Sequence, residues 1–145
     1  MLIQKVNRTD AEKVFINCRN VSAATLSAGA AVEWDVTTVT DGNAVTAAKS
    51  GSLAGLFAGV NDASLTDSSY GLVQVFGYRQ SAYISGASAG LSPGTFLQPT
   101  AGILTDMTMS AATTSGHTYV ALFETIAAAA GNSATLQWNV FIRAL

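Results

Sequence analysis

Apolar and polar residues alternate with a period of two along several segments of this 145-residue chain, and turn-forming residues separate the segments. Residues 14–19 read VFINCR and residues 32–37 read VEWDVT. Successive side chains of a strand point to opposite faces of a sheet, so this period is typical of half-buried β-strands with two different faces. The pattern therefore predicts a strand at each of these two places.

Turn-forming residues predict where strands end. Ser27 to Gly29 precede the second strand. Asp41-Gly42-Asn43 lies between Val- and Thr-rich stretches, and it predicts a hairpin because Asp-Gly tolerates the positive φ of a tight turn. Pro93-Gly94 is the preferred pair for a type II turn.

Further segments are predicted to be strands from their composition. Residues 53–60 are apolar but contain two glycines, which disfavour a helix, so a buried and bent strand is expected. The strongest predicted pair, residues 118–126 and 134–143, should form an antiparallel hairpin with residues 127–133 as a projecting loop. Three shorter runs, the first two separated by Gly77, are residues 70–76, 81–84 and 95–98.

Strands at short intervals, without a long amphipathic helix, indicate an all-β fold: a compact barrel or sandwich of short antiparallel strands with long loops. The length suits one core. We expect residues 1–10 to form an N-terminal arm and residues 11–145 to form a single β-rich domain.

The composition is unusually poor in charge, and this limits the function. Charged residues make up 11% of the chain and the net charge is -2, so the surface must be largely neutral and prone to association. Seven scattered Lys and Arg against nine acids argue against nucleic-acid binding. No apolar run reaches the roughly 20 residues of a membrane span, and the N-terminus lacks the apolar region of a signal peptide, so synthesis and folding in the cytoplasm are expected.

Few residues could support chemistry. His117 is the only histidine, and no pattern supplies the partner that would orient it as a base. Cys18 is the only cysteine, which excludes an intrachain disulfide. Asn61, Asp62 and Asp67 could bind a cation through oxygen, but their spacing matches no calcium loop and such residues are ordinary turn formers. We therefore predict no enzymatic activity, no catalytic residue, no metal and no cofactor.

Aromatic residues gather in one part of the sequence. Tyr70, Phe76, Tyr78 and Tyr83 could form a binding stripe for a sugar or a peptide. Aromatic side chains also suit strands, so packing within the sheet is the alternative reading.

Several segments resemble the small capsid decoration (cement) proteins of tailed bacteriophages. The similar stretch extends from Ala28 to Thr105 and includes GAAVEWDV, LAGLFAGVNDAS, YGLVQVFGYRQSAYISG and AGLSPGTFLQPTAGIL. The ending TLQWNVFIRAL is similar to a terminal strand of such proteins. The resemblance implies a structural protein on the outer surface of the virion, commonly a homotrimer, whose partner is the major capsid protein. A phage tail or fibre module that recognises host carbohydrate is the alternative.

The first eight residues are predicted to contact a neighbouring subunit or the capsid. This segment carries apolar residues ahead of the first strand, and an extended arm of this kind can add a strand to the edge of another sheet. The contact residues that we predict are Met1, Leu2, Ile3, Val6 and Arg8.

Overall fold

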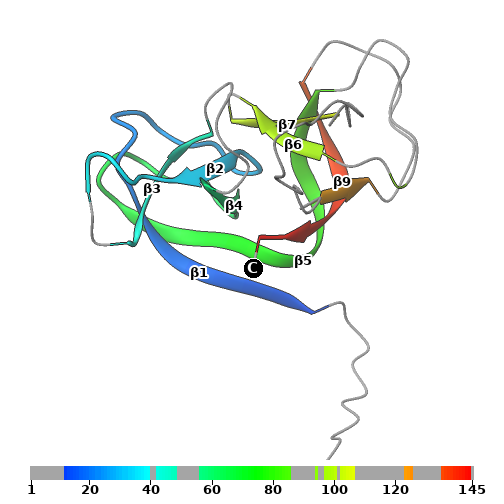
Figure 1. Ribbon diagram of the computed structural model, residues 1–145, viewed down its shortest axis with the longest axis horizontal. Helices are drawn as coiled ribbons and strands as arrows, with labels where there is room; N and C mark the ends of the chain where they lie inside the picture. Colours follow the sequence, from blue (N-terminus) through cyan, green and yellow to red (C-terminus); the bar gives the residue numbers. More distant parts are fainter. Residues whose placement is uncertain are drawn as a thin grey trace, which may run out of the picture.

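The computed structural model describes residues 12–39, 42–48, 56–85, 94, 97–100, 102–106, 123–125 and 135–144. This part of the chain forms nine strands and no α-helix, which confirms the all-β prediction (Figure 1). The strands are β1 (Lys13–Asn20), β2 (Ala31–Trp34), β3 (Ala44–Ala47), β4 (Phe57–Asn61), β5 (Tyr70–Ser85), β6 (Leu97–Thr100), β7 (Ile103–Asp106), β8 (Phe123–Thr125) and β9 (Thr135–Arg143).

Five strands form a closed ring. Their order is β1-β3-β2-β4-β5, and β5 pairs back onto β1 along most of the length of β1. Pairing is antiparallel except between β1 and β3, which run parallel. The interior of the ring is filled by one apolar cluster, which contains Cys18, Leu26, Val32, Val45, Ala58, Leu65, Val73 and Val75.

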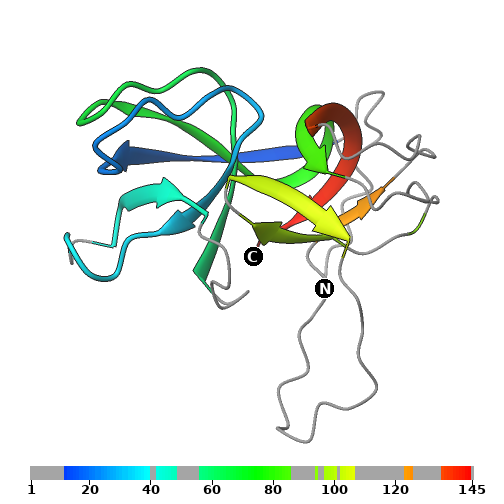
Figure 2. The ribbon, with the colours of Figure 1, turned by 90° about the horizontal axis from the view of Figure 1, so that it is seen from above.

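The second half of β5 leaves the ring and begins a second group of strands. It pairs with β9 in antiparallel and with β7 in parallel orientation, while β6 pairs with β7 and β8 pairs with β9. Figure 2 shows the two groups side by side, with β5 passing from one to the other. A second apolar cluster contains residues from both groups: Ala31, Ala48, Phe57, Val60, Ala82, Ile84, Leu97, Leu104, Val140 and Ile142.

Strands β2 and β4 lie between the two apolar clusters, and this changes one prediction. Every residue of β4 is buried, and Glu33 of β2 is only 4% exposed. The segment 32–37 was predicted to be a half-buried strand, but the strand ends at Trp34 and both of its faces are covered. Val36 follows in a loop and is 57% exposed. Alternation alone could not reveal a second layer of strands over the polar face.

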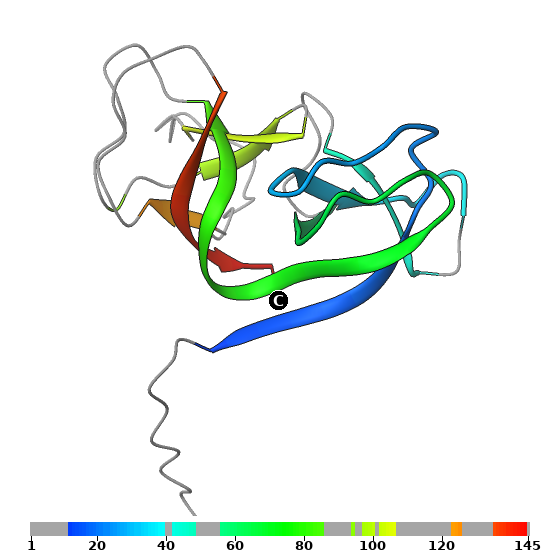
Figure 3. The ribbon, with the colours of Figure 1, turned by 180° about the vertical axis from the view of Figure 1, so that it is seen from behind.

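The predicted break at Gly77 is also wrong. Residues 70–76 and 81–84 belong to the single 16-residue strand β5, which bends strongly (Figure 3). Gly77 lies inside this strand with φ +99°, a conformation that glycine adopts without steric cost. A Cβ atom there would collide with the carbonyl oxygen of Glu12. The glycine thus bends the strand and lets β1 approach, and it does not end the strand.

The predicted hairpins are present, with shifted bounds. Strands β2 and β3 pair in antiparallel orientation, but β2 ends at Trp34 and β3 begins at Ala44, so the connection is longer than the predicted tight turn; Gly42 within it has φ +74°. Strands β8 and β9 pair as expected. The strand predicted at 95–98 is β6, two residues later, and β7 was not predicted. The predicted arm 1–10 and loop 127–133 lie outside the described residues.

Candidate interaction surface

Three large apolar side chains are exposed on one face of the β1–β5 pair. Tyr70 is 60% exposed, Leu72 is 49% exposed and Phe15 is 37% exposed. Leu72 lies opposite Asn17 in the antiparallel register, and Tyr70 lies opposite Arg19. Directly paired residues share a face, so these five side chains lie on the outer side of the ring. We call these five residues the β1–β5 outer face.

Strand periodicity explains why these residues face outward. The neighbouring positions of β1 and β5 belong to the ring interior, where Cys18 and Val73 are fully buried. Successive side chains alternate between faces, so the residues between them must lie outside the ring. The sequence could not identify this face, because Leu72 and Val73 are both apolar and either could have been the buried residue.

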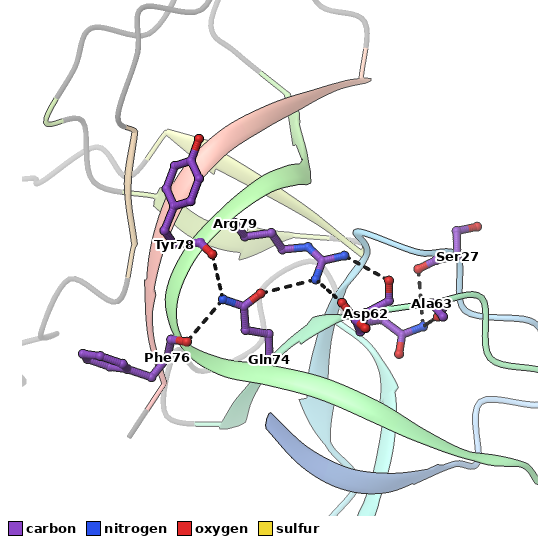
Figure 4. A network of polar contacts seen from close by, with 8 residues as sticks. Ser27, Asp62, Ala63, Gln74, Phe76, Tyr78 and Arg79 are labelled. Carbon is purple, nitrogen blue, oxygen red and sulfur yellow. Dashed lines mark hydrogen bonds and ion pairs between the residues drawn. The ribbon is translucent and has the colours of Figure 1, made fainter. Parts of the chain in front are cut away.

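A buried arginine holds the bend of β5 against the end of β4 (Figure 4). Arg79 is 6% exposed, and its Nη1 donates to Asp62 Oδ1 at 3.0 Å and to Gln74 Oε1 at 3.4 Å. Its Nη2 donates to the backbone oxygen of Asp62 at 3.2 Å. Gln74 Nε2 in turn donates to the carbonyl oxygens of Phe76 and Tyr78, at 3.2 and 3.1 Å. The network fixes the direction in which β5 leaves the ring.

Structural contacts involve both carboxylates that the sequence offered for a cation, whereas the buried Asn61 Oδ1 has no hydrogen-bond partner in the described structure. Asp62 binds Arg79, as described above, and Asp67 Oδ1 accepts a hydrogen bond from the backbone of Ala23 at 3.0 Å. Asn61 Nδ2 donates to the carbonyl oxygen of Ala63 at 2.6 Å. Within the described ranges, no three His, Cys, Asp or Glu residues come close enough to hold a metal ion. Asp62 and Asp67 lie between β4 and β5, and Asn61 is the last residue of β4.

A second face, between β5 and β9, carries aromatic side chains. Tyr78 pairs with Phe141, and Tyr83 pairs with Gln137, because an extra residue of β5 is accommodated between Arg79 and Ala82. Positions 137 and 141 share a face of β9, so the bulge places both tyrosines on the same side. Without the bulge, two residues five positions apart in a regular strand would point to opposite faces of the sheet. The sequence predicted Tyr78 and Tyr83 as part of an aromatic stripe but not the bulge that places them on one face, and Tyr70 of the same predicted stripe lies on the β1–β5 outer face instead.

Aromatic packing orders one end of this face. The Phe76 and Phe141 rings are 5.3 Å apart at 83°, an edge-to-face contact, and the Arg143 guanidinium lies 5.4 Å from the centre of the Phe141 ring. These contacts tie Phe76 to the sheet. Tyr78 and Tyr83 are half-buried and keep part of their surface accessible.

Other predicted residues are buried or lie elsewhere. Cys18 is buried, and its burial raises the pKa of the thiol to about 11, so the group stays protonated and poorly nucleophilic near neutral pH. His117 lies outside the described residues, as do the predicted contact residues Met1, Leu2, Ile3, Val6 and Arg8.

No protein-family model matches the chain, and no curated protein matches it either. In the described segments, no helix is long and apolar enough to cross a membrane.

Proposed function

We propose that this chain is a non-enzymatic structural protein that decorates and stabilises the outer surface of a phage capsid by bridging neighbouring major capsid protein subunits, as a homotrimer. The observation that carries the proposal is the β1–β5 outer face, where Tyr70, Leu72 and Phe15 are exposed together on a chain with only 11% charged residues. Exposed apolar patches of this kind mark sites of protein association. The major capsid protein is proposed as the partner because of the resemblance to phage decoration proteins.

The proposed mechanism is mechanical. A shell under outward pressure from packed DNA is stabilised by a clamp whose contacts are lost only when neighbouring capsid subunits separate. A specific interface buries roughly 800 Å² on each partner. A trimer that engages three equivalent sites gains avidity, because its second and third contacts are effectively intramolecular.

The experiment is co-sedimentation of the purified protein with capsid shells that lack it, followed by an electron cryo-microscopy map of the source particle. We expect saturable binding and density for the protein on the outside of the shell, where capsid subunits meet. Absence of binding, or density at the tail instead of the shell, would contradict the proposal.

A carbohydrate-binding tail or fibre module is the second candidate, and the bulge in β5 is the observation that favours it. The bulge brings the half-buried Tyr78 and Tyr83 to one face together with the exposed amide of Gln137. Aromatic rings flanked by amides suit the apolar and hydroxyl faces of a sugar. Glycan-array binding that is lost in Tyr83→Ala and kept in Tyr70→Ala would support this candidate over the first.

A further inference from the structure

Strand β1 has an open edge beside the outer face. It pairs with β5 along one edge from Lys13 to Arg19, but with β3 along the other edge only at Arg19 and Asn20. In the described part of the chain, no strand pairs with the remaining edge, which extends from Lys13 to Cys18. Its row of backbone donors and acceptors is available to an added strand.

The hydrogen bonds to β3 show which groups point to this edge. The N–H of Arg19 donates to Asn43 O at 2.9 Å, and the N–H of Val21 donates to Val45 O at 3.0 Å. Backbone donors of a strand alternate between its two edges, so the N–H of Asn17 points to the open edge. Neither a proline nor a covering segment blocks the edge within the described residues, and Lys13 is its only charge before Arg19.

We propose that the segment Met1 to Arg8 of a second copy of this chain adds as a strand to the open β1 edge, with Leu2 and Val6 against the outer face at Phe15. Eight residues are long enough to cover the six-residue edge, and residues 9–11, which can extend to about 10 Å, connect the arm to Glu12. The proposal rests on the self-association included in the proposed function and names its contact.

A second copy is a better source of this strand than the same chain. To fold back onto its own β1, the arm would need a tight turn within residues 9–12, which read TDAE. This stretch has neither a glycine nor an Asn-Gly or Asp-Gly pair, the residues that the favoured two-residue hairpin turns require. Donation from one copy to the next is a head-to-tail contact, which closes into a ring such as a trimer when the rotation between copies permits and otherwise continues as a filament.

The first test uses the full chain with two cysteines, Gln4→Cys and Asn17→Cys. Cys18 is buried and does not compete. Neighbouring strands place paired residues within the Cα separation of a disulfide. After mild oxidation and denaturation we expect covalent dimers and trimers. The control carries Gln4→Cys and Val36→Cys, which places the second cysteine away from the β1 edge. The proposal is overturned if the control forms covalent dimers and trimers in the same yield, or if the disulfide forms only within single chains.

The second test compares Asn17→Pro with Asn17→Ala. Proline removes the N–H that points to the open edge, whereas alanine keeps it. We expect the mass in solution to fall threefold for Asn17→Pro and to stay unchanged for Asn17→Ala, with the same circular dichroism spectrum for both. An unchanged mass for Asn17→Pro would overturn the inference. If Asn17→Pro does not fold, the cysteine pair alone decides.

Capsid binding is measured in parallel on the same variants, so that two failures can be told apart. If the wild type binds shells but forms no covalent dimers or trimers through positions 4 and 17, this inference fails and the proposed function stands. If the covalent species form and no shell is bound, the capsid proposal fails and the strand addition stands.

Discussion

At the residue scale, the polar side chains inside this protein define how its two groups of strands meet. Arg79 is buried beside Gln74 and Asp62, and its Nε has no hydrogen-bond partner in the described structure. A buried guanidinium is costly unless it is paired, so the Asp62 carboxylate and the surrounding carbonyl groups are needed to keep it there. Arg79 therefore has a structural role, because it joins the bend of β5 to the end of β4. The Asp62 carboxylate is engaged in this ion pair.

Removal of the arginine side chain should be strongly destabilising. We expect Arg79→Ala to lower the free energy of unfolding by about 3 kcal/mol, because it leaves buried acceptors without a donor and creates a cavity. Asp62→Ala should lower it by less, because the Asp62 side chain is 44% exposed and the backbone oxygen still accepts from Arg79. Urea unfolding of both variants measures the difference. An equal or larger effect of Asp62→Ala would contradict the assignment of Arg79 as the central residue.

A pH effect is expected in the loop that joins β2 and β3. Asp35 Oδ1 accepts hydrogen bonds from the backbone of Thr38 and Thr37, both at 2.8 Å, and these bonds lower the pKa of Asp35 to about 2. A lowered pKa means that the carboxylate adds stability above pH 3.8, and that this stability is lost as the pH falls through about 2. The carboxylate is in partial contact with solvent, which limits the effect to under about 1 kcal/mol.

The matched variant is Asp35→Asn, which keeps an acceptor and removes the charge. We expect the wild type to be more stable than Asp35→Asn at pH 6, and the difference between the two to shrink steadily as the pH falls toward 2. A stability difference that grows as the pH falls would show that the direction is wrong.

At the element scale, β5 organises the molecule. It closes the ring with β1 and β4, bends at Gly77, and then supports β9 and β7. Gly77 is required for the close approach of β1, because a Cβ atom at this position would collide with the carbonyl oxygen of Glu12. The bend and the bulge together decide which side chains reach the two candidate surfaces.

Gly77→Ala and Gly42→Ala form a matched pair for this claim. Both glycines have positive φ, +99° and +74°, but a Cβ atom at Gly42 would meet nothing within 4 Å. We expect Gly42→Ala to cost about 1 kcal/mol of stability from backbone strain alone. Gly77→Ala should cost clearly more and should increase hydrogen exchange of the β1 amides. Equal costs would mean that the close approach of β1 does not depend on this glycine.

The same strand shows what could be predicted from the sequence and what could not. Local alternation was sufficient to place β1 and β9, because it depends only on neighbouring residues. The continuity of β5 through Gly77 depends on β1, which is distant in the sequence. The shared face of Tyr78 and Tyr83 depends on a bulge against β9. The open edge of β1 depends on where β3 stops pairing, and none of these has a local sequence signal.

At the scale of the whole molecule, the two groups of strands share one apolar cluster. Val60 of the ring and Val140 of the second group both belong to it and are fully buried. The outer face at Phe15 and Leu72 remains exposed, although the chain has few charges to keep a free monomer soluble. Burial of this face against another copy would remove the apolar surface from water, at roughly 25 cal/mol per Å².

Light scattering of the purified protein at micromolar concentration tests this central claim most directly. We expect three times the 14.9 kDa of one chain for the wild type, and one chain for the double variant Phe15→Ser, Leu72→Ser. Val36→Ser removes an apolar side chain that lies in a loop and is more exposed than Phe15 or Leu72, and it should keep the wild-type mass. A wild-type mass of one chain, or a double variant that remains a trimer, would contradict association through the β1–β5 outer face.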